Sequence, residues 1–208
     1  EAKSGHIRWE RNLLKEFGGR LMSGRGYGES PLIDGDRLIC TPGGPDAMVV
    51  ALDRTSGKTI WQSKIPHIGT KGRDGAAFAS ISISRAAGVK QYVTLCGRGL
   101  IGLEAESGKF LWGYNDISNQ TANIPTPIVS GDYVFSANGY HAGSVLLKIA
   151  KTSEGIAAHE VYRLKGNRFQ NHHGGFVLID GHIYGGHGSN NGLPTCLDLE
   201  TGKIKWKR

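Results

Sequence analysis

Four six-residue segments of this chain align without gaps and end in tryptophan: Ser4-Gly-His-Ile-Arg-Trp9, Ser56-Gly-Lys-Thr-Ile-Trp61, Ser107-Gly-Lys-Phe-Leu-Trp112 and Thr201-Gly-Lys-Ile-Lys-Trp206. They contain all four tryptophans of the protein. The first three tryptophans are 52 and 51 positions apart, whereas the last is 94 positions further on, nearly two periods. A degenerate repeat is therefore expected in between, and KTSEGIAAHEVYRL (151–164) provides it, with Val161 or Tyr162 in the tryptophan column.

Two further columns repeat in the same register. Each unit has a hairpin signal upstream of its turn, as in PLIDGDRLIC (31–40) and VLIDGHIYGG (177–186), where glycine accepts the positive φ of a tight turn. An apolar run such as MVVALD or LIGLEA precedes each Ser-Gly or Thr-Gly turn. Each period thus predicts four short strands, and four strands per roughly 50 residues are typical of propeller blades.

The sequence therefore predicts an all-β protein, a single β-propeller region over 1–208 built from four-stranded antiparallel blades. The expected blades are 30–64, 80–114, 126–163 and 174–207, with an orphan outermost strand at 6–12. A four-blade arc leaves two large apolar faces uncovered, which a soluble monomer rarely tolerates. We expect the chain to be part of a larger ring or half of a ring closed by two copies, ahead of a free four-bladed ring.

Composition narrows the functional classes. Glycine makes up 32 of 208 residues and proline 7, which suits many tight turns, and no apolar stretch is long enough to span a membrane. The net charge of +7 raises the question of a nucleic-acid partner, but the basic residues are spread singly, so no nucleic-acid partner is expected.

Cys40 and Cys96 occupy the same place in successive repeats, and therefore lie on neighbouring sheets about 10 Å apart. No disulfide between them is expected.

The pattern of an apolar strand, Asp or Glu, a Ser/Thr-Gly-Lys turn and then Trp resembles the tryptophan-docking motif of the pyrroloquinoline-quinone-like (PQQ-like) repeat family, and the resemblance extends from Gly5 to Trp206. The resemblance implies that Trp9, Trp61, Trp112 and Trp206 pack between blades. It also implies bacterial relatives with rings of seven or eight blades. These include quinone-dependent alcohol and sugar dehydrogenases and the lipoprotein scaffold of the outer-membrane protein assembly machine.

Candidate ligand contacts come from the loops that enter each innermost strand, since these open onto the central channel. They are Glu29, Ser80, Thr126, His172, His173, Arg25, Arg73 and Asn123. Such a mixture could hold an anionic or polyhydroxylated ligand, although a polar channel mouth is also what any hydrated propeller presents. Adjacent histidines on an extended segment point to opposite sides, so no metal site is expected at His172 and His173.

For a quinone dehydrogenase, the resemblance implies a ring-stacking tryptophan at the channel, a vicinal cysteine pair, a carboxylate base and calcium ligands. The cysteines of this chain are not adjacent, and its tryptophans all belong to the packing column. PQQ with calcium is therefore disfavoured, and no cofactor is predicted. We expect an exported, periplasmic or secreted, bacterial binding or scaffold module with a protein or glycan partner. The alternative is a quinone-dependent alcohol or sugar dehydrogenase or a degenerate relative, and whether the chain is an enzyme stays open.

Overall fold

The computed structural model describes all residues 1–208 and contains four four-stranded antiparallel sheets, which confirms the predicted fold class. Sheet 1 contains β1 (Leu32–Asp34), β2 (Arg37–Cys40), β3 (Val49–Asp53) and β4 (Thr59–Ser63). Sheet 2 contains β5 (Ser82–Ser84), β6 (Gln91–Cys96), β7 (Gly99–Glu104) and β8 (Phe110–Tyr114). Sheet 3 contains β9 (Ile128–Ser130), β10 (Tyr133–Asn138), β11 (Gly143–Thr152) and β12 (Gly155–Leu164). Sheet 4 contains β13 (Phe176–Ile179), β14 (His182–His187), β15 (Leu193–Asp198) and β16 (Ile204–Lys207).

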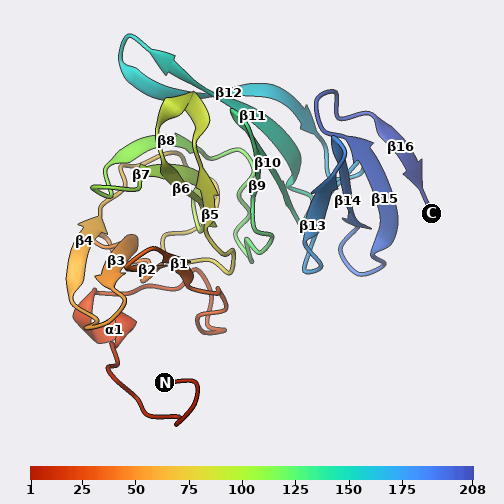
Figure 1. Cartoon of the computed structure of the whole chain (residues 1–208). Coiled ribbons are helices and arrows are strands. Elements are labelled where there is room, and N and C mark those ends of the chain that lie inside the picture. The colour runs from red at the N-terminus through yellow and green to blue at the C-terminus, as the bar shows by residue number, and fades with distance from the viewer.

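The sheets follow one another around an open arc, with the N-terminal segment at one end and β16 at the other (Figure 1). In every sheet the strands pair in sequence order. Antiparallel order places the turns after the first and third strands at one end of each sheet, here called the turn face. The loop after the second strand and the connections between sheets lie at the opposite end, here called the loop face.

Four apolar clusters hold the arc together. Sheets 1 and 2 share one that includes Ile39 and Leu103, sheets 2 and 3 share one that includes Leu95 and Val145, and sheets 3 and 4 share one that includes Phe135. The fourth lies on the outer face of sheet 1. Because both faces of an inner sheet are covered, every residue of its central strand β6 is buried, including the polar Gln91 and Thr94.

Two of the repeating tryptophans, Trp9 and Trp61, pack on glycines of the sheet that follows them in the chain. A Cβ atom built on Gly57 would lie 2.6 Å from the Trp9 ring, and one on Gly108 would lie 2.5 Å from the Trp61 ring. Both glycines have φ near +70°, at +71° and +74°, so the Ser-Gly turn supplies the left-handed conformation and the space for the indole together.

In the degenerate repeat the residue that takes the tryptophan position is Tyr162, not Val161. A Cβ on Gly202 would lie 2.7 Å from its ring, and its hydroxyl donates to the Leu199 carbonyl at 2.8 Å. The Trp9 indole likewise donates to the Arg54 carbonyl at 3.1 Å.

The Trp61 indole N–H is buried without a partner. The equivalent acceptor in the next sheet, the Ala105 carbonyl, instead accepts a hydrogen bond from Arg37 at 2.6 Å.

The interface between sheets 2 and 3 is built differently. Trp112 has no glycine of sheet 3 to pack on; it lies against Gly102 of its own sheet and donates to the Gln91 side chain at 2.7 Å. In compensation, the ten-residue strands β11 and β12 extend over the short 3-10 turn at Ala86–Gly88 of sheet 2, where Ile149 is buried. This extension of the hairpin is visible in Figure 1.

Residues 6–12, predicted as the orphan outermost strand of a further blade, pair with none of the four sheets present and form no strand in this chain. They lead instead into the short helix α1 (Leu13–Glu16), whose N-cap is Asn12, and the segment lays Trp9 and Phe17 on the outer face of sheet 1.

Neither helical segment, α1 nor the 3-10 turn, has the length or apolar character of a membrane span. The three cysteines are buried free thiols.

Candidate functional site

Two of the predicted channel residues connect neighbouring sheets. The Ser80 hydroxyl accepts a hydrogen bond from the Ser30 backbone N–H at 3.0 Å, and the Thr126 hydroxyl accepts one from the Ser80 N–H, also at 3.0 Å. The same column of the repeat therefore ties sheet 1 to sheet 2 and sheet 2 to sheet 3.

Asn123 is also engaged inside the protein. It is fully buried, and its amide donates to the carbonyls of Cys96 at 3.0 Å and Gly97 at 3.1 Å. Its side-chain oxygen accepts from Asn138 at 2.5 Å. All of its hydrogen-bonding capacity is used to join the loops of sheets 2 and 3.

Glu29 is a partly buried carboxylate that holds the segment before β1 against the end of β2. It accepts a hydrogen bond from the Thr41 backbone N–H at 2.6 Å and a second from the Thr41 hydroxyl. Burial outweighs this backbone hydrogen bond and raises the pKa of Glu29 to about 7. Burial also raises the pKa values of Tyr27 and Cys40, and the charge of Glu29 raises both further, so both stay neutral near pH 7.

Arg25 and His173 are two predicted residues that meet at a cavity. Together with Phe78, Ala122 and Ile124 they line a small cavity of about 130 Å³. Burial lowers the pKa of His173, and the neighbouring His172 and Arg25 lower it further. Arg73 stays exposed on its own loop.

The expectation that His172 and His173 point to opposite sides is wrong. Their ring centroids are 4.0 Å apart, because the chain bends at this point instead of continuing as a strand. The Nδ1 atom of His172 contacts the Ser189 carbonyl, so it carries the proton. No group of three or more His, Cys, Asp or Glu side chains is placed to hold a metal ion.

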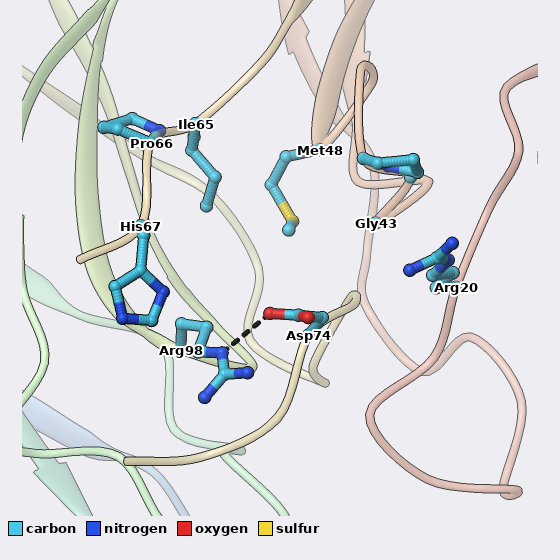
Figure 2. Close-up of a pocket in the computed structure, with 10 residues that line it drawn as sticks. Arg20, Gly43, Met48, Ile65, Pro66, His67, Asp74 and Arg98 are labelled. Carbon is cyan, nitrogen blue, oxygen red and sulfur yellow. Dashed lines mark hydrogen bonds and ion pairs between the residues drawn. The ribbon is translucent and has the colours of Figure 1, made fainter. Parts of the chain in front are cut away.

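A larger cleft lies on the loop face between sheets 1 and 2, with a volume of about 250 Å³ (Figure 2). Arg20 comes from the segment before β1, Asp74 and His67 from the connection between the sheets, and Arg98 from the turn between β6 and β7. Met48 and Ile65 supply apolar surface beside them.

Asp74 and Arg98 form the ion pair of this cleft, with the Arg98 Nε atom 2.7 Å from Asp74 Oδ1. The hydrogen bond from Arg98 lowers the pKa of Asp74 most, and the charges of Arg98, Arg20 and His67 lower it further. The guanidinium of Arg98 also donates to the carbonyls of Thr70 at 3.3 Å and Gly72 at 3.4 Å. Sequence reasoning missed Arg20, His67 and Arg98, because they come from three separate loops with no shared motif.

Charge is distributed unequally between the two faces. The loops and connections of the loop face, taken together with residues 20–31 that lead into β1, carry eight basic side chains, namely Arg20, Arg25, Lys64, Lys71, Arg73, Arg98, Lys165 and Arg168. They carry four acidic ones, namely Glu29, Asp46, Asp74 and Asp116. The turns of the opposite face carry six of each sign, the basic ones being Arg54, Lys58, Arg85, Lys90, Lys109 and Lys203 and the acidic ones Asp36, Glu106, Asp132, Glu154, Asp180 and Glu200. The excess positive charge among these connections is thus confined to the loop face.

Radially stacked four-stranded sheets define a β-propeller, and in this one the rings of Trp9, Trp61 and Tyr162 pack on the glycines of Ser/Thr-Gly turns. The family model described as outer membrane protein assembly factor BamB matches residues 1–208, so the chain belongs to this family of PQQ-like repeat propellers. No curated protein matches the chain in a sequence search.

Solved structures share the fold at low sequence identity. Quinohemoprotein alcohol dehydrogenase from Comamonas testosteroni matches 88% of this chain with 16% identity and a TM-score of 0.60, over 35% of its own length. BamB from Moraxella catarrhalis matches 86% with 18% identity and a TM-score of 0.54, over 47% of its length. A europium-containing methanol dehydrogenase matches 95% with 16% identity and a TM-score of 0.57, over 45% of its length. The chain therefore spans less than half of each of these proteins.

The residues of this chain do not fit a quinone held over calcium. Cys40, Cys96 and Cys196 are buried and far apart in sequence, so they supply no vicinal pair. Trp61, Trp112 and Trp206 lie on the outermost strands, away from the channel, and Trp9 lies outside sheet 1. The chain on its own therefore does not supply the donor set that the resemblance implies for a quinone enzyme.

Proposed function

We propose that this chain is a binding or scaffold segment of a propeller that engages a protein partner through its loop face. The excess of basic over acidic side chains on the loop face, eight against four, compared with equal numbers on the turn face, carries the proposal, since an uneven field steers and orients a charged partner. The predicted channel residues Ser80, Thr126 and Asn123 do not compete with this reading, because their hydrogen bonds are made within the protein.

Ring closure is part of the proposal. The outer face of sheet 4 exposes Val177, Ile179 and Trp206, with exposed fractions of 55%, 54% and 41%. An apolar sheet face of this kind calls for a covering sheet, from further blades or from a second copy. In either case the loop faces of all blades would line one side of a single disc.

An extracytoplasmic, bacterial location is the third part. Its support is the family description, which refers to outer-membrane protein assembly. A scaffold in that compartment would act by holding its partner in place and not by changing it chemically.

Site-specific photo-cross-linking in intact cells tests the proposal. A photoreactive residue is placed at Arg73 on the loop face or at Lys58 on the turn face, two exposed basic positions matched in charge. We expect one recurrent protein adduct from position 73 and none from position 58. Equal yields from both positions, or adducts from neither, would contradict the proposal.

Titration of the full-length protein with the quinone and calcium tests the competing dehydrogenase reading. A stoichiometric absorbance change together with dye reduction in the presence of alcohols would replace the scaffold proposal with an oxidoreductase.

A further inference from the structure

Arg20 lines the loop-face cleft, and its charged side chain has no hydrogen-bond or ion-pair partner within the chain. Its backbone is fixed on both sides: its N–H donates to the Pro42 carbonyl at 3.0 Å, and its carbonyl accepts from the Ala76 N–H at 2.8 Å. Gly43 permits this close packing, since a Cβ there would lie 2.2 Å from the Arg20 carbonyl oxygen. The guanidinium itself makes no hydrogen bond or ion pair, in contrast with that of Arg98 (Figure 2).

The surroundings of Arg20 are mixed in character. Figure 2 shows Arg20 on one side of the cleft and His67 with Arg98 on the other, with Asp74 between them. Met48 and Ile65 add an apolar surface. The cleft therefore offers a free cation, an apolar wall and a carboxylate whose second oxygen, Oδ2, has no hydrogen bond.

This combination selects among anions. A polyphosphate or nucleic-acid backbone presents closely spaced charges that Asp74 would repel. A peptide presents backbone N–H donors beside its carboxylates, and Asp74 Oδ2 can accept from one of them while Arg20 takes the carboxylate. The apolar wall at Ile65 and Met48 suits an aliphatic side chain next to the acidic one.

We propose that the cleft between sheets 1 and 2 binds an extended acidic peptide segment, with a carboxylate on Arg20 and an adjacent aliphatic side chain against Ile65. The inference rests on the proposed protein-binding function and names the chemistry of the partner. Arg98 contributes as a fixed second cation, positioned by Asp74 and by the Thr70 and Gly72 carbonyls.

Fluorescence anisotropy of the whole chain tests this directly. The probe is a short fluorescein-labelled peptide in which glutamate and leucine alternate between serines, and its counterpart carries glutamine for glutamate. We expect saturable binding of the glutamate peptide, and binding about fivefold weaker for the glutamine peptide or for the Arg20→Gln variant. The matched control is Arg168→Gln, which removes an equal charge from an exposed loop-face residue outside the cleft and should leave affinity nearly unchanged.

Circular dichroism and thermal unfolding confirm that both variants fold, since neither guanidinium has an internal partner. If the two variants lose peptide affinity equally, the peptide responds to the overall positive charge of the loop face, and the assignment of the cleft is overturned. Equal affinity for the two peptides, no binding at all, or tighter Arg20-dependent binding of a single-stranded oligonucleotide would overturn the acidic-peptide class. If the peptide fails while the cross-link at position 73 persists, this inference falls and the scaffold function stands; if the cross-link fails as well, both fall.

Discussion

Gly108 and Gly181 have nearly the same backbone conformation, with φ of +74° and +73°, in opposite surroundings. A Cβ on Gly108 would lie 2.5 Å from the Trp61 ring, whereas a Cβ on Gly181 would have nothing within 4 Å. The pair therefore separates two roles of glycine in this repeat, a left-handed turn and a seat for the indole. Such a seat joins sheet 1 to sheet 2 at Gly108 and sheet 3 to sheet 4 at Gly202, whereas sheets 2 and 3 pack without one.

Alanine at Gly108 should destabilise the chain much more than alanine at Gly181. Both changes force a side chain into left-handed backbone, at about 1–2 kcal/mol. Only Gly108→Ala also displaces a buried indole, which adds about 1–3 kcal/mol of overpacking. Urea unfolding followed by circular dichroism measures the difference, and equal losses for the two variants would mean that Trp61 does not depend on its glycine seat.

At the scale of elements, the segment before β1 is held by one titratable group, the carboxyl group of Glu29. Glu29 binds Thr41 at the end of β2, and burial raises its pKa from 4.5 to about 7. The folded chain therefore holds this proton more tightly than the unfolded chain does. The resulting stabilisation is complete below about pH 4.5 and is lost as pH rises through about 7.

This linkage predicts that the Glu29 contribution falls by up to about 3 kcal/mol between pH 5 and pH 8. The Glu29→Gln variant keeps a neutral side chain of similar shape, so its free energy of unfolding should change less over this range. Urea midpoints of both proteins at the two pH values give the measurement, with the exposed Glu200→Gln as the matched control. Parallel pH profiles for wild type and Glu29→Gln would show that the carboxyl group is ionised when folded.

For the whole molecule, the bare outer face of sheet 4 predicts that Trp206 changes its role with assembly. Trp61 is 9% exposed and packs on Gly108, so Trp61→Ala should lower the free energy of unfolding by about 3–5 kcal/mol in any form of the protein. Trp206 is 41% exposed, so Trp206→Ala should cost much less in the 208-residue chain. In the assembled ring, the loss of unfolding free energy caused by Trp206→Ala should approach the loss caused by Trp61→Ala.

Sedimentation first identifies the assembled form, since a mass of about twice 22.4 kDa means closure by two copies. Unfolding of Trp206→Ala is then compared in the two forms. An equally small loss in both would show that no sheet packs on this face.

The sequence predicted the sheets well because their signals are local. Hairpin turns, apolar runs and the Ser/Thr-Gly turn before each tryptophan all act within a single unit of the repeat. The pattern at 6–12 is also strand-like, but a strand needs a neighbouring strand, and the four sheets of this chain offer none to this segment, which leads into α1.

The candidate site was less predictable. The Ser80 and Thr126 hydroxyls lie in the predicted column, but a pattern cannot distinguish a hydroxyl that binds a ligand from one that accepts a neighbouring backbone N–H. Arg20, Asp74 and Arg98 are distant in sequence and meet only when sheet 2 stacks on sheet 1.

The strictly consecutive pairing of strands has a consequence for biogenesis. A sheet is complete as soon as its last strand has been made, so a chain that emerges N-terminus first from a ribosome or a secretion pore can mature stepwise, without waiting for distant segments. Each finished sheet becomes the template on which the next one condenses. The sheet completed last exposes an apolar face on which the next sheet can pack. Among the four sheets of this chain, that is the face of sheet 4 that carries Trp206.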